Sequence, residues 1–254
     1  MKYSIISATH NAERFVERCL VSILSQTYPD FEWIVQDGTS QDRTAEIIEK
    51  YQDVRIKFTS EPDCGIYDAW NRGVKRASGD WAVFLGADDF FLDKDALAKC
   101  HRHIKRLEKN ILFAYGALAR FKGNEVIRIE NRSLRDLYLR FGKCMPFPMA
   151  ATFIRMSLLR QYRFDHEKYK IAADYDLAAR YALHDNIARI PVMAVGMEEG
   201  GVSSNKKTFC QMEDEIARVL HEVVIPRAPQ IMHGCLNHFW SRDDSLEEQL
   251  TSRQ

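Results

Sequence analysis

Residues 61–89 read EPDCGIYDAWNRGVKRASGDWAVFLGADD, and they join a helical pattern to a strand pattern. Small and apolar residues recur there at the spacing of one helix face: Ile66, Ala69, Trp70, Gly73, Val74 and Ala77. The run WAVFL at 81–85 is short and continuously apolar, which is typical of a buried strand. Gly86, Asp88 and Asp89 follow that run. The stretch therefore predicts a helix that returns the chain to a sheet, with a polar turn where the strand ends.

The same alternation continues from this stretch toward the N-terminus. Apolar and β-branched runs predict strands at 3–9, 31–35 and 54–58, and amphipathic patterns predict helices between them. Thr39 and Asp42 have the spacing of a capping box before the second helix. Strands that alternate with helices in this way are typical of βαβ units with a parallel sheet. The predicted fold class is therefore α/β.

The second half of the chain has a less regular pattern. After residue 110 we expect a hairpin around 122–124, a helix near 133–141, a strand at 150–154 and a helix at 172–183. No Pro- or Ser-rich linker separates the two halves. We therefore expect one domain, built on a mostly parallel central sheet with helices on its faces.

The composition excludes several classes of protein. Of the 254 residues, 46% are hydrophobic, so the chain can bury a substantial core and is neither disordered nor fibrous. The 36 Lys and Arg residues balance 36 Asp and Glu residues. This balance lacks the basic footprint of a nucleic-acid-binding protein, so we expect no nucleic-acid partner.

The sequence also gives expectations about location and thiol chemistry. Its apolar stretches are strand-sized, too short to span a membrane. The N-terminal residues meet polar side chains too early for a secretory signal. Both features predict a cytoplasmic protein. The six cysteines are scattered singly, without the paired spacing of a zinc site, and are expected to be reduced thiols.

Polar residues follow three of the predicted strands. Thr9 and Asn11 come at the end of the first, Asp37 after the second, and Asp88 and Asp89 after the fourth. Because ligands of open parallel sheets bind beyond the carboxyl ends of the strands, we expect these side chains to converge on one crevice. The alternatives are a helix-capping role for Thr9 and Asn11 and an Asx turn at Asp37.

Asp88 and Asp89 are adjacent carboxylates at the end of a buried strand. Two like charges there repel each other unless a cation or hydrogen-bond donors compensate them. Their oxygens suit Mg²⁺ or Mn²⁺, which complete their shells with phosphate oxygens and water. The alternative is a solvated turn with one aspartate capping a helix that starts near Asp93. Asp68 and Asn71 share the polar face of the preceding helix, which a solvated surface also explains.

Together these segments resemble the family-2 glycosyltransferases, inverting enzymes of the GT-A fold that use nucleoside diphosphate sugars. SIISATHNAERFVERCLVSILSQTYPDFEWIVQDGTSQDRTAEIIEKY, at 4–51, is similar to the opening of that family, and 61–89 is similar to its donor-site block. The resemblance implies a Rossmann-like GT-A domain with residues 1–110 as the donor half and 111–225 as the acceptor half. Residues 226–254 form an extension without an assigned role.

The resemblance also implies roles for residues on the nucleotide side. Thr9 and Asn11 are expected to line the base and ribose pocket, Asp37 to contact the nucleoside, and Asp68 to lie against the donor. The expected nucleoside is uridine. The sequence departs from the family pattern nearby at three positions: Ala8, His10 and Gln36.

Asp88 and Asp89 stand where the family has its DXD-type element. The resemblance places Asp88 toward ribose or phosphate and makes Asp89 the ligand of a divalent cation, Mn²⁺ or Mg²⁺. Gly86 occupies the position where many relatives carry the first aspartate of the element. Metal binding is therefore expected to depend mainly on Asp89 and the diphosphate.

The second half is expected to supply a general base, because a single displacement needs the acceptor hydroxyl to lose its proton as it attacks. The sequence ADYD offers two candidates, which point to nearly opposite sides of a helix. Asp176 suits a surface ion pair with Arg180. Asp174 aligns with the catalytic aspartate of the family's ED-type motif, so we expect it to be the base, although it also suits a simple helix N-terminal carboxylate. Ala173 and Met149 depart from the family pattern on this side.

Two further features each allow two interpretations. GGVSS at 200–204 suits a loop that orders over bound donor, or an ordinary turn. Phe239 and Trp240 suit contact with a membrane or a partner, because acceptors in the family are often lipid-linked, or packing on their own domain.

The function expected from the sequence is transfer of a sugar from an NDP-sugar to a glycan or lipid-linked acceptor. The expected donor is a UDP-sugar. Such a reaction belongs to surface polysaccharide synthesis, in the cytoplasm or at the inner face of the membrane. The alternatives are a nucleotide-sugar phosphohydrolase, which uses water as acceptor, and a non-catalytic nucleotide-sugar-binding subunit.

Overall fold

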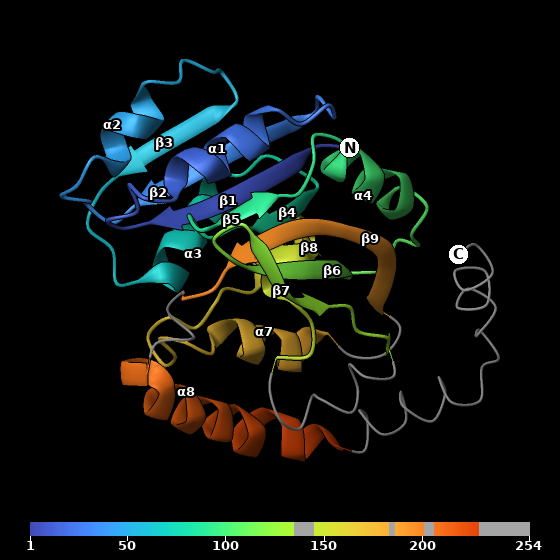
Figure 1. The fold of residues 1–254 in the computed structure, drawn as a ribbon. Helices are drawn as coiled ribbons and strands as arrows, with labels where there is room; N and C mark the ends of the chain where they lie inside the picture. The colour runs from blue at the N-terminus through green and yellow to red at the C-terminus, as the bar shows by residue number, and fades with distance from the viewer. Residues whose placement is uncertain (135–144, 183–185, 201–205, 229–254) are drawn as a thin grey trace.

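The computed structural model describes residues 1–134, 145–182, 186–200 and 206–228 (Figure 1). One central sheet runs through the molecule and carries helices on both faces, as the α/β prediction requires. The predicted helix near 133–141 lies outside the described residues apart from its start.

The first half of the chain builds the parallel part of the sheet. Its strands are β1 (Tyr3–Thr9), β2 (Phe31–Asp37), β3 (Ile56–Ser60) and β4 (Trp81–Phe84). They lie in the order β3-β2-β1-β4, and every neighbouring pair is parallel. The connecting helices are α1 (Val16–Leu24), α2 (Thr44–Glu49) and α3 (Ile66–Arg76). Every carboxyl end in this half therefore meets the same edge of the sheet.

The second half extends the sheet beyond β4 with strands of both directions. In spatial order these are β8 (Thr152–Arg155), β6 (Phe113–Lys122), β9 (Ile187–Glu198) and β5 (Asp89–Phe91), and β7 (Glu125–Glu130) forms a hairpin with β6. β6 and β9 keep the direction of the parallel half, whereas β5, β7 and β8 oppose it. The predicted mostly parallel sheet is confirmed.

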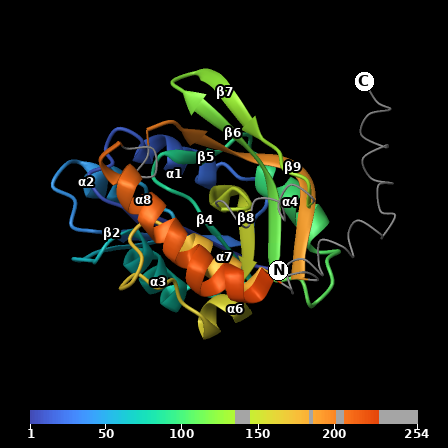
Figure 2. The same cartoon turned by 90° about the horizontal axis from the view of Figure 1, so that it is seen from below.

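The remaining helical elements are α4 (Ala96–Ile104), η1 (Met149–Ala151), α6 (Met156–Gln161), α7 (Ala173–Tyr181), α8 (Lys206–Val219), η4 (Leu220–Val224) and η5 (Ile225–Arg227). α1 and α4 cover one face of the sheet, and α3, α6, α7 and α8 cover the other, as Figure 2 shows from below. The protein is thus a three-layer α/β structure.

Alternate residues of the strands feed two separate apolar layers. On β1, Ile6 packs in the layer of α3 and α7, whereas Ile5 packs in the layer of α1 and α4. Gly73 lets α3 press closely on β1, because a Cβ there would lie only 2.6 Å from Cγ2 of Ile6. This close approach fixes the start of α3 near the end of the sheet.

Two local predictions differ from the structure for identifiable reasons. β3 starts at Ile56 and not at Val54, because the Asp53 carboxylate accepts a hydrogen bond from the Arg55 N–H and forms a turn. Val54 is 98% exposed in this turn. The predicted strand at 150–154 begins later, since Ala150 and Ala151 form the 3₁₀ turn η1.

The predicted capping box before α2 is wrong. Thr39 has a left-handed backbone, with φ of 57°, and its hydroxyl donates to the Gly38 carbonyl. The Asp42 carboxylate accepts from the backbone N–H of Thr44, the first residue of α2, and from that of Glu13. Asp42 therefore links α2 to the loop after β1 and does not pair with Thr39.

A buried carboxylate holds the opposite edge of the parallel half together. Glu32 is 2% exposed and accepts hydrogen bonds from Ser4 and from the backbone and hydroxyl of Ser78, with ammonium groups of Lys2 and Lys57 within 3.1 Å. Burial alone would raise its pKa, but Lys57, Ser78 and the other donors lower it to about 2. Glu32 lies on β2, and its partners come from β1, β3 and the segments before β1 and β4.

Replacing Glu32 with Gln is expected to lower the free energy of unfolding by about 2 kcal/mol at pH 7, because charged donors lose their buried partner. The pKa of Glu32 is lower in the folded state, so its stabilisation is present above the unfolded value near 4.5 and is lost as the pH falls toward about 2. Denaturant titrations at pH 7 and pH 3 measure both effects. The exposed Glu49→Gln variant serves as the control. Equal stability of Glu32→Gln and the wild type at pH 7 would contradict this role.

Candidate active site

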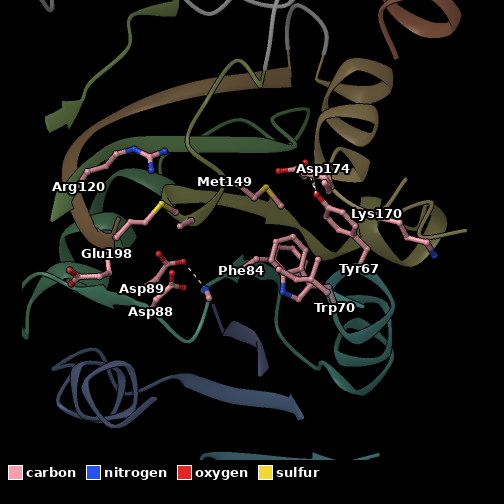
Figure 3. A pocket seen from close by; sticks show the side chains of 15 residues that line it. Tyr67, Trp70, Phe84, Asp88, Asp89, Arg120, Met149, Lys170, Asp174 and Glu198 are labelled. Carbon is pink, nitrogen blue, oxygen red and sulfur yellow. Dashed lines mark hydrogen bonds between the residues drawn. The ribbon is translucent and has the colours of Figure 1, made fainter. Parts of the chain in front are cut away.

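A cavity of about 200 Å³ opens between the end of β4 and the start of α7 (Figure 3). Carboxylates stand at both ends: Asp88 and Asp89 at one, Asp174 at the other. Much of the wall between them is apolar: Ile66, Tyr67, Trp70, Phe84, Met149, Ile171 and Met197. The cavity thus joins residues of the two halves of the chain across an apolar floor.

Asp88 and Asp89 form a like-charge pair in which Asp89 is buried and Asp88 is half-buried. Asp89 is 4% exposed, and its Oδ2 accepts a 2.7 Å hydrogen bond from the Gly86 N–H. Its Oδ1 is also buried and has no hydrogen-bond partner among the described residues. Burial raises the pKa of Asp88, and burial together with the Asp88 charge raises the pKa of Asp89 well above its usual range. Asp89 begins the short strand β5, so the alternative in which one of the pair caps a helix near Asp93 is wrong.

Nearby arginines compensate the charge of this pair only in part. The Arg18 guanidinium forms an ion pair with Glu198, at 2.9 Å, and donates a hydrogen bond to the backbone carbonyl of Asp88, at 3.2 Å. Arg120 forms an ion pair with Glu130, 2.5 Å away. The arginines therefore border the carboxylate pair without closing on it.

The donor set of this end fits a divalent cation. It offers an orphaned carboxylate oxygen and a second carboxylate beside it, the hard oxygen ligands that Mg²⁺ and Mn²⁺ prefer. A Cβ on Gly86 would lie 2.6 Å from Oδ1 of Asp88 and 3.2 Å from Oδ2 of Asp89. Glycine at this position thus leaves room for both carboxylates to converge. In the described part of the chain no cluster of three or more His, Cys, Asp or Glu residues supplies a full protein shell.

Asp37 is the centre of a separate polar group at the ends of β1 and β2. It is fully buried, and its carboxylate accepts from the hydroxyls of Thr9, Ser40 and Ser60 and from the Ser40 N–H. Burial would raise its pKa, but the donors of Ser40, Ser60 and Thr9 outweigh it and lower the pKa. Thr9 and Asp37 thus come together as predicted, but the protein's own donors fill the Asp37 oxygens.

Asn11 fixes the loop after β1 against the loop after β2. Its side-chain Oδ1 accepts from the Gln41 N–H, and its own N–H donates to the Ser40 hydroxyl. Asn11 has a positive φ of 49°, uncommon outside glycine. His10 approaches the Gly38 carbonyl at 2.9 Å. Thr9, Asn11 and Asp37 form one group, and none of them lines the cavity.

Asp68 and Asn71, both on α3, form hydrogen bonds with other residues of the protein. Asp68 accepts from the Cys64 N–H and from the Arg72 guanidinium, at 2.8 Å, and it does not line the cavity. Asn71 exchanges two hydrogen bonds with the backbone of Phe164, a residue 93 positions away. The interpretation of both as a solvated face is wrong, since both are buried.

Asp174 stands in the first turn of α7 and faces the cavity. Its Oδ1 accepts from the Tyr67 hydroxyl at 2.9 Å and from the Tyr175 N–H at 2.8 Å. Its Oδ2 receives no hydrogen bond from the described residues. Burial raises its pKa, although the bond from Tyr67 opposes this rise. One carboxylate oxygen is thus held in place while the other is free for a ligand.

Asp176 points away from the cavity and forms the predicted ion pair with Arg180, with N–O distances of 2.9 Å. The pair is not at the surface as predicted, because Asp176 is only 4% exposed. The prediction that the two aspartates of ADYD use opposite faces is confirmed.

Several cavity residues escape sequence reasoning. Tyr67 reaches Asp174 across 107 positions, and Arg120, Lys170 and Glu198 line the cavity from elements without a local motif. Only the position of Tyr67 beside Asp68, in the first turn of α3, could have suggested it. Gly200 is described, but 201–204 of the predicted loop lie outside the described residues, as do Phe239 and Trp240.

None of the described helices combines the length and the apolar character needed to cross a membrane.

A family model described as "Glycosyl transferase family 2" matches residues 4–169. Among curated proteins, a PGL/p-HBAD biosynthesis glycosyltransferase of Mycobacterium bovis is 40% identical over 117 residues, 45% of each chain. The UDP-Glc:alpha-D-GlcNAc-diphosphoundecaprenol beta-1,3-glucosyltransferase WfgD of Escherichia coli is 34% identical over 126 residues, 49% of this chain and 48% of its own. The matches thus span about half the length of these curated relatives.

Solved structures share the fold. TarS of S. aureus, in complex with UDP-GlcNAc, superposes with a TM-score of 0.69 at 22% identity, over 96% of this chain and 74% of its own. The mannosyltransferase PcManGT of Pyrobaculum calidifontis, in complex with GDP-Man and Mn²⁺, gives a TM-score of 0.64 at 20% identity, over 94% and 70%. The fold is therefore GT-A, as the sequence predicted.

The two aspartates of α7 are expected to respond oppositely to neutralisation. Asp176→Asn should lower the free energy of unfolding by about 2 kcal/mol, because it breaks a buried ion pair. Asp174→Asn should keep or raise stability at pH 7, because burial raises the Asp174 pKa and its ionised form therefore opposes folding. Melting curves of both variants at pH 7 test this contrast. A larger loss of stability in Asp174→Asn would contradict it.

Proposed function

Because the chain belongs to glycosyl transferase family 2, we propose that it moves a sugar from a UDP-sugar to a glycan or lipid-linked acceptor by a metal-assisted, inverting single displacement. The observation that carries this proposal is that Asp174, whose Oδ2 receives no hydrogen bond from the described residues, lines one cavity with Asp88 and Asp89. Oδ1 of Asp89 also has no partner among these residues. A base and a diphosphate site at opposite ends of a cavity are what an inverting displacement requires.

The diphosphate of the donor is proposed to bind at the Asp88–Asp89 end. Asp89 would hold Mn²⁺ or Mg²⁺, with Asp88 turned toward ribose or phosphate. The bound ion would neutralise charge on the diphosphate as it leaves. The Mn²⁺ in the PcManGT complex supports a divalent cation in this fold. UDP-glucose in the name of WfgD and UDP-GlcNAc in the TarS complex favour uridine.

The nucleoside is proposed to lie at the loops that carry Thr9, Asn11 and Asp37, beyond the carboxyl ends of β1 and β2. Both Asp37 oxygens already accept hydrogen bonds from the protein. A direct contact therefore requires a hydrogen-bond donor of the nucleoside to replace one of the protein hydroxyls, such as that of Ser60. Asp68 is proposed to lie against the donor, in the same first turn of α3 as the cavity residues Ile66 and Tyr67.

Asp174 is proposed to act as the general base. Its Oδ2 would accept the proton of the acceptor hydroxyl while the acceptor oxygen forms a bond to the anomeric carbon. The bond from that carbon to the diphosphate oxygen breaks, and its electron pair leaves with the diphosphate. Tyr67 and the Tyr175 N–H keep Oδ1 fixed, so that Oδ2 stays aimed into the cavity.

The acceptor is proposed to be the growing end of a surface glycan on a lipid carrier, handled in the cytoplasm at the inner face of the membrane. The diphosphoundecaprenol acceptor in the name of WfgD supports this class. The nearly apolar floor of the cavity suits the face of a sugar ring, which is less polar than its edge.

Asp89→Ala is expected to abolish transfer and to remove the dependence of UDP binding on Mn²⁺, because the orphaned oxygen is its proposed ligand. Thermal shifts with UDP, with and without Mn²⁺, measure this coupling. The exposed Asp93→Asn variant, four positions on, controls for general loss of charge. Unchanged manganese dependence in Asp89→Ala would show that the metal assignment is wrong.

Asp174→Asn should reduce turnover by roughly a hundredfold or more with unchanged UDP affinity, the usual scale for losing a general base. Release of UDP from UDP-glucose and UDP-GlcNAc in the presence of a GlcNAc-diphospholipid acceptor measures turnover. Asp176→Asn, assayed below its melting temperature, is the matched control and should keep most of its turnover. The reverse result would exchange the two roles. Product analysis separates transfer from hydrolysis of the donor.

A further inference from the structure

The segment that leads into Asp174 is held by a carboxylate from a distant helix. Glu215 of α8 is 4% exposed, and it accepts backbone hydrogen bonds from Lys170 at 3.0 Å, Ile171 at 2.8 Å and Ala172 at 3.0 Å. Gln211, one turn earlier on α8, donates to the same carboxylate. Four donors thus converge on one buried side chain that lies beyond the part of the chain matched by the family model.

This arrangement anchors the segment immediately before α7. The N-cap residue of α7, Ala172, has no side chain that can accept a hydrogen bond, and the three N–H groups that donate to Glu215 all precede the first helical residue, Ala173. A negative charge at a helix N-terminus is favourable, and Glu215 supplies it from α8. The orientation of the first turn of α7 therefore depends on α8.

The same peptide segment is gripped from the opposite side by α3. The Tyr67 hydroxyl lies 2.6 Å from the Ile171 carbonyl oxygen and 2.9 Å from Oδ1 of Asp174. Ile171 is thus bound at its N–H by Glu215 and at its carbonyl by Tyr67, whose single hydroxyl proton is shared between this carbonyl and Oδ1 of Asp174. A shift of this segment would turn Asp174 within the cavity.

We propose that Glu215 is a positioning residue for the acceptor-side base: it fixes residues 170–172 so that Oδ2 of Asp174 points at the acceptor hydroxyl. This inference depends on the proposed role of Asp174. It gives α8 a structural role in the site: the helix binds the backbone of residues 170–172 and contacts no proposed substrate.

The charges around Asp174 give this proposal a distinctive signature. The groups that face it are Tyr67 of α3, Glu215 of α8, Lys170 before α7 and, across the cavity, Asp88, Asp89 and Arg120. Besides burial, the Glu215 charge raises the pKa of Asp174, whereas the Tyr67 hydrogen bond lowers it. Removing each partner should therefore move the acid limb of the rate profile in opposite directions.

The test compares the pH–rate profiles of Glu215→Gln and Tyr67→Phe with the wild type. Glu215→Gln should lower kcat about tenfold, shift the acid limb to lower pH and leave the donor KM within twofold. Tyr67→Phe should shift the acid limb to higher pH. Glu222→Gln is the matched control, because Glu222 follows on the same helical segment, is exposed and forms an ion pair with Lys168. It should leave kcat and the acid limb unchanged.

UDP binding to each variant, measured by thermal shift with Mn²⁺, shows that the donor half remains folded. Glu215→Gln that binds UDP normally and keeps both kcat and the wild-type acid limb would overturn the positioning role. An acid limb that moves to higher pH in Glu215→Gln would overturn it as well. An active Asp174→Asn variant would instead refute the proposed base itself, so the two failures are distinguishable.

Discussion

Two adjacent carboxylates after β4, Asp89 buried and Asp88 half-buried, repel each other, and the arrangement of the cavity follows from this constraint. Asp89 is compensated only in part: the Gly86 N–H binds one of its oxygens, the other has no hydrogen-bond partner among the described residues, and nearby Arg18 and Arg120 are engaged with glutamates. The pair lies at the turn that joins β4 to β5, and β5 pairs with β9. A cationic ligand that enters here gains more than it would at a solvated turn.

Two other buried carboxylates in the molecule have hydrogen-bond donors on both oxygens. Glu32 and Asp37 each collect several donors, and their pKa values fall below the usual range. Asp89 and Asp174 are buried with fewer donors, and their pKa values rise. This contrast separates carboxylates that hold the fold from carboxylates that keep an oxygen for a ligand, and it is visible only once burial and partners are known.

α3 connects the two halves of the site. Its close contact with β1 at Gly73 fixes it to the parallel sheet, and Asn71 binds the backbone of Phe164 in the second half of the chain. Tyr67 then reaches the segment before α7 from its first turn. The rings of Tyr67, Trp70, Phe84 and Phe164 pack against one another beneath the cavity, with centroids 4.7 to 5.7 Å apart. The distance between the two ends of the cavity is therefore set by one rigid layer.

The sequence by itself determined the parallel half, the position of the Asp88–Asp89 turn and the opposite faces of Asp174 and Asp176, because strand and helix periodicities are local and survive any packing. It missed β5, placed β3 two residues early and treated the Asp176 ion pair as exposed. Only the tertiary structure decided which oxygens are free: the donors on Asp37 come from three strand ends, and Glu215 holds the approach to Asp174 from 43 to 45 positions away. Such contacts depend on how whole elements pack, and no local pattern encodes them.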